Sequence, residues 1–235
     1  MDTNRYRPKR RSRLRILCGK AFHTCRRYGQ WYLSGRRYAR ERSSSVLPHC
    51  VHKHDSIFMR PLKNVDMYLQ ENKKTNNLLA MQCLDGILLA PGEVFSFWRL
   101  VGRPSRRKGY LEGLVLQSGT LTKGTGGGLC QLSNLIYWLT LHTPLTVVER
   151  WRHCYDVFPD VNRKLPFASG ATVAYNYIDL QIANPTAEYY QLYMSRDDER
   201  LYGEWSCETE QRLRYRDHER NHWIGWHYWG GVTWH

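Results

Sequence analysis

Residues 126–141, GGGLCQLSNLIYWLTL, contain the features that decide the fold we expect: three glycines, one cysteine and an apolar run. The run over residues 130–141 has the length of a helix, and the next three residues, HTP, are typical of a helix end. Glycines just before a helix favour a tight turn in which the backbone can approach another group closely. The stretch therefore predicts a cysteine in the first turn of a helix, behind a glycine-rich loop.

The sequence on either side predicts helices first and short strands later. Residues 62–84 fit one or two helices that are broken near residues 73–76. Strand-like runs follow, with a hairpin turn predicted at residues 196–199. These runs are residues 94–97, 114–116, 121, 145–149, 172–177, 178–183, 189–194 and 201–205. Because helices and strands do not alternate, the order predicts an α+β fold with N-terminal helices and a largely antiparallel sheet.

The composition divides the chain into a basic segment and a nearly neutral remainder. Hydrophobic residues make up 42% and aromatic residues 13%, which excludes wholesale disorder and low-complexity classes. Residues 1–42 contain 14 Lys and Arg against two acidic residues, so they hold +12 of the total charge of +14. We expect a basic, partly helical arm over residues 1–45, a domain over residues 46–207, and an aromatic and His-rich tail over residues 208–235 that packs on or extends the domain.

The basic arm has three interpretations: a solvated segment, a helix that covers the domain, or an amphipathic helix on an anionic membrane surface through residues 5–42. Charges interrupt any secretory signal, and no run of about 18 apolar residues predicts a transmembrane helix. The seven cysteines form no CxxC pair, which favours reduced thiols. We expect a cytoplasmic protein, peripheral at the inner membrane face. Nucleic acid is the least expected partner, because the near-neutral domain has no nucleic-acid-binding motif.

Cys130 is the candidate nucleophile. Unpaired amides and the positive end of a helix dipole are expected to lower the pKa of a thiol in the first turn. His153 is the candidate base and Asp179 the residue that orients it, an order found by analogy in papain-like and transglutaminase-like enzymes. The predicted oxyanion and substrate loop consists of Gly126, Gly127, Gly128, Gln131 and Ser133. The alternative is a buried thiol behind a tight turn.

Two patterns imitate metal sites, but we predict no metal and no other cofactor. Residues 218–222 spell HExxH, in a segment so rich in His, Glu and Arg that a chance match is easy. His49, Cys50, His52 and His54 alternate in what we expect to be a solvated loop, without a second ligand pair.

Three segments together resemble the VanW family: PGEVFSFW at residues 91–98, GGGLCQLSN at residues 126–134 and HTPLTVVER at residues 142–150. Some cell-wall members of the family are thought to be L,D-transpeptidases, and the resemblance places their motif cysteine at Cys130 and a histidine at His153. This chain departs from many relatives at Trp151, where they have an earlier histidine, and at Gly170, where they have an aspartate. The resemblance implies a role in vancomycin resistance, with cysteine-dependent acyl transfer on peptidoglycan stem peptides or precursors. The alternative is a non-catalytic accessory module that binds a cell-wall precursor.

Overall fold

The computed structural model of the 235-residue chain describes residues 12–58, 66–117, 120–151, 170–215, 227–229 and 232–234. The helices are α1 (Arg13–Leu33), α2 (Met67–Leu84), α3 (Phe97–Val101), the 3-10 helix η2 (Arg106–Lys108) and α4 (Cys130–Thr140). The strands are β1 (His49–Ile57), β2 (Ile87–Leu89), β3 (Val94–Ser96), β4 (Glu112–Gln117), β5 (Thr120–Thr125), β6 (Thr146–Glu149), β7 (Gln181–Ala183), β8 (Tyr190–Arg196), β9 (Arg200–Cys207), β10 (His227–Trp229) and β11 (Val232–Trp234). No helix within these ranges combines the length and the apolar character that a membrane crossing requires.

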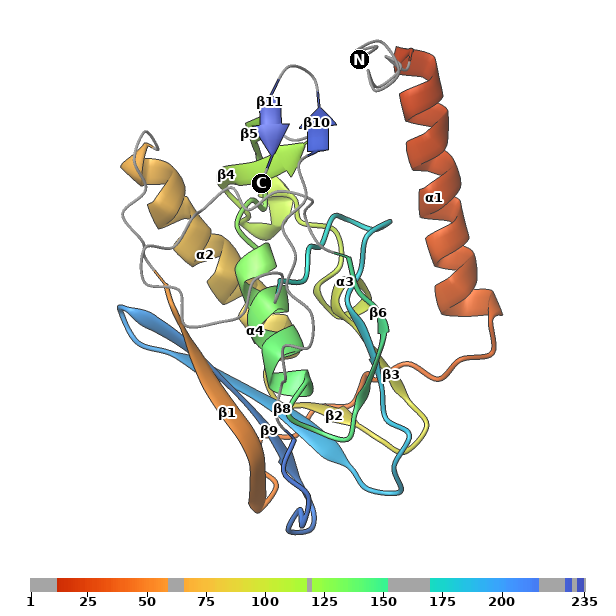
Figure 1. Cartoon of the computed structure of the whole chain (residues 1–235), viewed down its shortest axis with the longest axis vertical. Helices are drawn as coiled ribbons and strands as arrows, with labels where there is room; N and C mark the ends of the chain where they lie inside the picture. Colours follow the sequence, from red (N-terminus) through yellow and green to blue (C-terminus); the bar gives the residue numbers. More distant parts are fainter. Residues whose placement is uncertain are drawn as a thin grey trace.

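Antiparallel pairing joins the strands of every described sheet (Figure 1). A four-stranded sheet has the order β1-β9-β8-β2, a three-stranded sheet has the order β3-β7-β6, and β4-β5 and β10-β11 are two-stranded. The turn between β8 and β9 is closed by Asp197, whose Oδ1 accepts hydrogen bonds from the amides of Glu199 (2.8 Å) and Arg200 (2.6 Å). The α+β class with an N-terminal helix and antiparallel sheets is thereby confirmed, as is the predicted hairpin.

Helix α4 lies with α2 on one face of the four-stranded sheet (Figure 1). Its most buried apolar side chains recur at helical spacing: Leu132, Leu135, Ile136 and Leu139. Gly203 on β9 makes room for this contact, because a Cβ atom there would lie 2.6 Å from Cδ1 of Leu139. At the same C-terminal end of the helix, the indole of Trp205 donates a 3.1 Å hydrogen bond to Oγ1 of Thr140. The sheet thus fixes α4 and, with it, the position of Cys130 as its first residue.

Helix α2 runs without interruption, so the predicted break near residues 73–76 is wrong. Residues 73–76, KKTN, interrupt the apolar pattern on which the predicted break depends. In the structure, Asn76 and Asn77 are both fully buried. Asn77 donates through Nδ2 to the carbonyl of Lys73 at 2.9 Å, within the helix, whereas the side chain of Asn76 contacts a different segment. Tertiary contacts therefore outweigh helix propensity at these positions.

Strand pairing corrects two further predictions. Residues 49–54, expected to be a solvated loop, belong to β1, which pairs with β9 along its whole length. Residues 172–177, expected to be a strand, form isolated bridges instead, from Thr172 to Trp151 and from Ala174 to Ile178. In both cases the outcome depends on whether a distant segment offers backbone partners, which a local pattern does not reveal.

The second half of the basic arm packs on the domain. Trp31, Tyr38 and Ala39 are at most 5% exposed and belong to the hydrophobic core. The guanidinium of Arg27 forms a two-pronged ion pair with Glu149 on β6 and donates through Nε to the carbonyl of Asn176 at 2.9 Å. The boundary at residue 45 stays a prediction. Of the three interpretations of the arm, a helix that covers the domain describes this part of α1, and full solvation does not.

Candidate functional site

The loop before Cys130 has a backbone that requires glycine. Gly126 and Gly128 have φ angles of 77° and 93°, in the region that side chains disfavour. Gly127 has an ordinary φ but lies against the backbone of Gly113, where a Cβ atom would come within 2.2 Å of the Gly113 carbonyl carbon. The three glycines therefore bring β4 and the start of α4 into direct contact, and the predicted glycine-rich loop before a cysteine-bearing helix is present.

Asn76 on α2 holds this loop in place. Its Oδ1 accepts a hydrogen bond from the amide of Leu111 (2.8 Å), and its Nδ2 donates to the carbonyls of Leu111 (3.1 Å) and Gly127 (2.9 Å). The sequence prediction missed this residue, because a polar run inside a helical pattern indicated a break. A polar residue at a helix position that faces the core would be the signal to look for, since buried amides need partners.

Three consecutive amides at the start of α4 have no acceptor in another residue within the described ranges. The amides of Gly126 and Gly127 are occupied, because they donate to the carbonyls of Leu111 (2.9 Å) and Gly124 (3.2 Å). The amides of residues 128 and 129 have no described acceptor, and that of Cys130 contacts only its own thiol. Such amides can hold a developing negative charge next to the nucleophile. Of the predicted loop glycines, Gly128 is thus the one whose amide is unpaired among the described residues.

Gln131 and Ser133 have other partners. The amide group of Gln131 donates to Oγ of Ser56 (3.1 Å) and to the carbonyl of Ile57 (2.6 Å), so it faces the end of β1. The hydroxyl of Ser133 donates to the carbonyl of Ala171 at 2.6 Å and is fully buried. In the described structure, both side chains anchor α4 to its neighbours.

Asn134 completes the attachment of α4 to the segment that follows residue 170. Its Oδ1 accepts from the amide of Ala171 at 2.6 Å, so Ser133 and Asn134 together bind both backbone groups of that residue. The thiol of Cys130 lies 3.7 Å from the carbonyl of Val173, two residues further along. Cys130, Ser133 and Asn134 thus all contact one short segment, residues 171–173. Asn134 was not among the predicted site residues.

Burial, not the helix dipole, has the largest effect on the pKa of the Cys130 thiol, which corrects the expectation of a lowered pKa. Burial is the largest effect and raises the pKa of Cys130, while contacts with the backbone of Val173 and of Cys130 itself lower it in part. Desolvation outweighs the helix dipole because it acts on the whole thiolate charge, whereas the dipole offers only partial charges. Cys130 therefore needs a base before it can attack.

His153 lies outside the described residues, but the chain that leads to it is described up to Trp151. Trp151 bridges to Thr172, whose amide donates to the Trp151 carbonyl at 2.7 Å. Thr172 directly precedes Val173, which contacts the Cys130 thiol. The described chain thus reaches Trp151, which pairs with the neighbour of Val173, two residues before His153. Pairing of these two residues stays a prediction.

Asp179 is fully buried next to β3 and α3. Its Oδ1 accepts from the amides of Trp98 (3.0 Å) and Leu180 (3.0 Å), and its Oδ2 accepts from Ser96 Oγ (2.6 Å) and Gln181 Nε2 (3.3 Å). Burial raises the pKa of Asp179 to about 6, although the hydrogen bonds and Arg27 oppose the shift. These contacts tie β7 to the β3–α3 junction, and its role in orienting His153 stays a prediction.

Within the described ranges, no group of three or more His, Cys, Asp or Glu side chains is arranged to hold a metal ion. The β1 histidines face aromatic rings: His52 stacks on His142 with ring centroids 3.9 Å apart, and His54 lies 6.0 Å from Trp138. Burial lowers the pKa of His52 to about 4, and the neighbouring His142 and His54 add to the shift. The HExxH pattern at residues 218–222 lies outside the described residues.

Comparisons with known proteins assign the chain to a family. Residues 72–206 match the family described as "VanW like protein". The Vancomycin B-type resistance protein VanW of Enterococcus faecalis is 36% identical over 189 residues, which are 80% of this chain and 69% of that protein. An uncharacterized Bacillus subtilis protein, YoaR, is 32% identical over 114 residues, which are 48% of this chain but only 36% of its own length. No solved structure matches the chain. The chain therefore belongs to the VanW family.

Proposed function

We propose that the chain is a VanW-like, cell-wall-associated acyltransferase that uses Cys130 on peptidoglycan stem peptides or their precursors. The observation that carries the proposal is the thiol at the first residue of α4, next to the amides of residues 128–130, which have no acceptor in another described residue. The Enterococcus faecalis relative is named as a vancomycin resistance protein, which supports a role in vancomycin resistance. The family resemblance supports an L,D-transpeptidase-like reaction.

In the proposed reaction, His153 removes the thiol proton and Sγ of Cys130 attacks the carbonyl carbon of a peptide bond. The amides of residues 128–130 stabilise the resulting oxyanion. When it collapses, the C–N bond breaks, the proton passes from His153 to the leaving amine, and a thioester remains on Cys130. An acceptor amine or water then attacks the thioester and releases the thiol. Because burial raises the pKa of Cys130, the base is essential to the first step.

The chain order is consistent with this proposal by analogy. Cys130 begins α4, His153 follows β6, and Asp179 immediately precedes the segment that leads into β7. Papain-like and transglutaminase-like enzymes use the same order of nucleophile, base and orienting residue. Asp179 is the proposed third member. We expect both Asp179→Ala and Asp179→Asn to lose activity, and Asp179→Asn to do so while it remains folded.

The test is mass spectrometry of the intact protein after incubation with muropeptides. We expect a covalent adduct in the wild type that is absent in Cys130→Ala. Cys83→Ala is the matched control, since Cys83 is also a partly buried thiol in contact with the core. The proposal fails if the wild type forms no adduct with any stem peptide, or if the adduct persists in Cys130→Ala.

The second candidate function is a non-catalytic module that binds a cell-wall precursor in the same place. Burial raises the pKa of the Cys130 thiol, which favours this function, since a thiol with a raised pKa is a poor nucleophile on its own. In the same experiment, this function predicts binding of the muropeptide without an adduct, at equal affinity in the wild type and in Cys130→Ala.

For its location, we propose that residues 5–42 hold the protein at the anionic inner face of a membrane. Helix α1 supports this because it contains no acidic residue and leaves several apolar side chains exposed. The wild type is expected to sediment with anionic vesicles at low salt and to be released as salt screens the charges. Failure to sediment at low salt would refute the proposal.

A further inference from the structure

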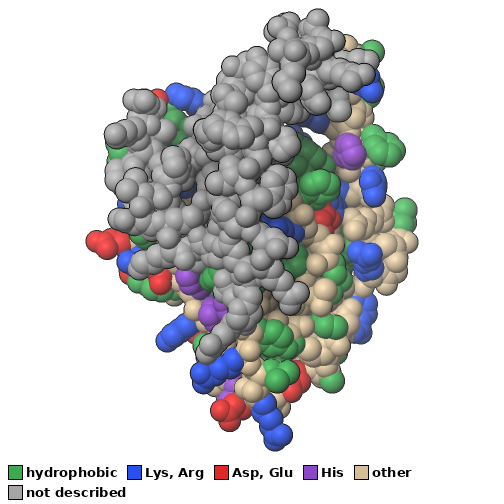
Figure 2. Space-filling view, in the orientation of Figure 1, with side chains coloured by type: hydrophobic (Ala, Val, Ile, Leu, Met, Phe, Trp, Pro, Cys, Tyr) green, Lys and Arg blue, Asp and Glu red, His purple; other side chains and the backbone are tan. Residues whose placement is uncertain are grey.

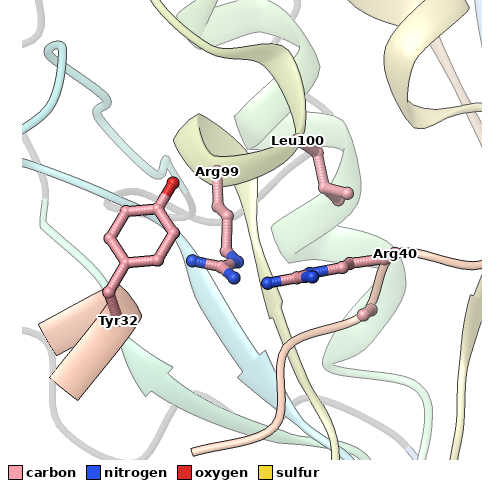
Figure 3. Close-up of a pocket in the computed structure, with 5 residues that line it drawn as sticks. Tyr32, Arg40, Arg99 and Leu100 are labelled. Atoms are coloured by element: carbon pink, nitrogen blue, oxygen red, sulfur yellow. The ribbon is translucent and has the colours of Figure 1, made fainter. Parts of the chain in front are cut away.

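A shallow hollow of about 350 Å³ lies at the C-terminal end of α1 (Figure 3). It is formed by the last turn of α1, the segment that follows it, and α3. The residues that line it are Tyr32, Ala39, Arg40, Arg99 and Leu100. An adjoining part of the same hollow adds Arg36, Arg37 and Glu93. Its size is at the lower end of the range found for ligand sites.

Two arginines in this hollow face each other. In Figure 3, the guanidinium groups of Arg40 and Arg99 point toward one another from different elements. Burial lowers the pKa of Arg99, and the charge of Arg40 lowers it further. Among the described side chains, neither arginine is in an ion pair. The pair therefore places unneutralised like charges side by side, which is unfavourable until an anion joins them.

Arg99 is held in position for such a role. Its Nη1 donates to the carbonyl of Trp31 at 3.1 Å, and its Cζ lies 4.7 Å from the ring centroid of Tyr32 and 4.8 Å from that of Tyr38. These contacts fix the plane of the guanidinium and leave its other donors for a ligand. Arg40 is exposed and makes no hydrogen bond within the described structure, so it is free to close on the same ligand.

Arginines outnumber the carboxylate that lines this hollow. Glu93 lines the adjoining part of the hollow together with four arginines. Its Oε2 accepts a hydrogen bond from the amide of Ala90 at 3.1 Å. The combined lining therefore keeps a net positive charge.

We propose that this hollow is a binding site for a phosphate group, held between Arg40 and Arg99. Guanidinium groups match the oxygens of phosphate with two parallel hydrogen bonds each, and a phosphate can satisfy both arginines at once. The site is separate from Cys130 and does not depend on acyl transfer.

The phosphate can belong to a lipid headgroup or to a soluble molecule. Helix α1 favours the lipid, because an exposed apolar stripe runs along it towards the hollow: Leu14, Leu17, Tyr28 and Tyr32, each 41–69% exposed. On the face shown in Figure 2, basic and hydrophobic side chains lie side by side along α1. The experiment has one arm for each source.

The full-length chain is tested with two probes, vesicles of phosphatidylcholine with or without phosphatidic acid, and inorganic phosphate in a calorimetric titration. Arg40→Gln is the test variant, and it is expected to fold because Arg40 makes no described hydrogen bond. Arg26→Gln is the matched control, since it removes the same charge from an exposed position of the basic arm outside the hollow. We expect Arg40→Gln to weaken phosphate-dependent binding roughly tenfold or more, and Arg26→Gln to change it by less than about twofold.

The outcomes separate this site from the proposed membrane location. Vesicle binding that Arg40→Gln weakens selectively supports a lipid phosphate, and calorimetric binding of inorganic phosphate that it weakens selectively supports a soluble one. Vesicle binding that both variants weaken equally, without a selective loss of inorganic phosphate binding in Arg40→Gln, refutes the site while the membrane location stands. Binding of neither probe by the wild type also refutes the site.

Discussion

The buried side chain of Asn76 holds the glycine-rich loop, and we expect its removal to destabilise the protein. Asn76→Ala removes three hydrogen bonds, one from the amide of Leu111 and two to the carbonyls of Leu111 and Gly127. The Leu111 carbonyl keeps a partner, since it also accepts from the amide of Gly126 at 2.9 Å. The Leu111 amide and the Gly127 carbonyl lose the side-chain partner described for them.

The expected loss of stability follows from these two groups. A buried polar group left without a hydrogen bond costs about 1–3 kcal/mol, and the Leu111 amide is only partly buried. We therefore expect Asn76→Ala to lower the free energy of unfolding by about 2–4 kcal/mol. Asn77→Ala is the matched control. Asn77 is equally buried on the same helix, but its side chain donates a single hydrogen bond, to the Lys73 carbonyl, so its loss should cost about 1 kcal/mol.

Urea denaturation of the two variants and the wild type measures this difference. A second readout is the rate at which iodoacetamide alkylates Cys130, which should rise in Asn76→Ala because the loop beside the thiol loosens. In Asn77→Ala the alkylation rate should stay close to that of the wild type. Equal free energies of unfolding for the two variants, within about 0.5 kcal/mol, would refute the reasoning.

Three further predictions concern buried charges and the thiol. Cys130 should react with iodoacetamide more slowly than the exposed Cys18 and Cys25 near neutral pH, with a rate still rising above pH 9.0, because burial raises the pKa of Cys130 from that ordinary value. Burial raises the pKa of Asp179 from 3.8 to about 6, so the folded protein holds a proton there that the unfolded chain has already lost. This proton stabilises the folded protein below about pH 4, and the stabilisation is lost as pH rises through about 6. In urea denaturation, the free energy of unfolding of the wild type should therefore fall by about 3 kcal/mol relative to that of Asp179→Asn. Arg27→Met leaves the carboxylate of Glu149, 18% exposed, without its guanidinium, and should lower the free energy of unfolding by about 3–5 kcal/mol.

Each of these has a control. Alkylation in denaturant should equalise the cysteines, and a Cys130 that reacts as fast as Cys18 in the folded protein contradicts the first prediction. Asp198→Asn, at a fully exposed position, should leave the pH dependence unchanged. The second prediction is contradicted if the free energies of unfolding of the wild type and Asp179→Asn differ by a constant amount from about pH 4 to 7. Arg26→Met, next to Arg27 but exposed, should cost less than about 0.5 kcal/mol, and an equal cost for both arginines contradicts the third.

The sequence predicted the parts of the fold in which local pattern and tertiary environment agree. Helix α4, the β4-β5 hairpin and the turn between β8 and β9 all combine a clear apolar pattern with turn residues, and each forms close to its predicted position. The break in α2 and the loop in place of β1 were predicted wrongly for a common reason. Both are rich in polar residues, and distant partners supply what their side chains and backbones need: the loop at Gly127 for α2 and the strand β9 for β1.

The glycine-cysteine motif of the candidate site was predictable from the sequence, but the residues that hold it in place were not. A cysteine behind glycines at a helix start is visible in the sequence because the glycines serve the backbone locally. The contacts of Asn76 and Asn134 are invisible there, because each joins segments about 35 residues apart in the chain. The raised pKa of Cys130 was missed for a related reason. The helix dipole follows from local sequence, but the burial that outweighs it depends on the packing of residues 171–173 against α4.

The pairing of β1 with β9 limits how the protein can be shortened. The family match begins at residue 72, after β1 has ended, so a chain cut to the matched residues would lack a strand of the main sheet. Such a cut would leave β9 as an open edge, with backbone groups along residues 200–207 that had been bonded to β1. Open edges of this kind recruit strands from other molecules and cause aggregation. Residues 49–57 should therefore be kept in any shortened version prepared for crystallisation or enzymatic assay.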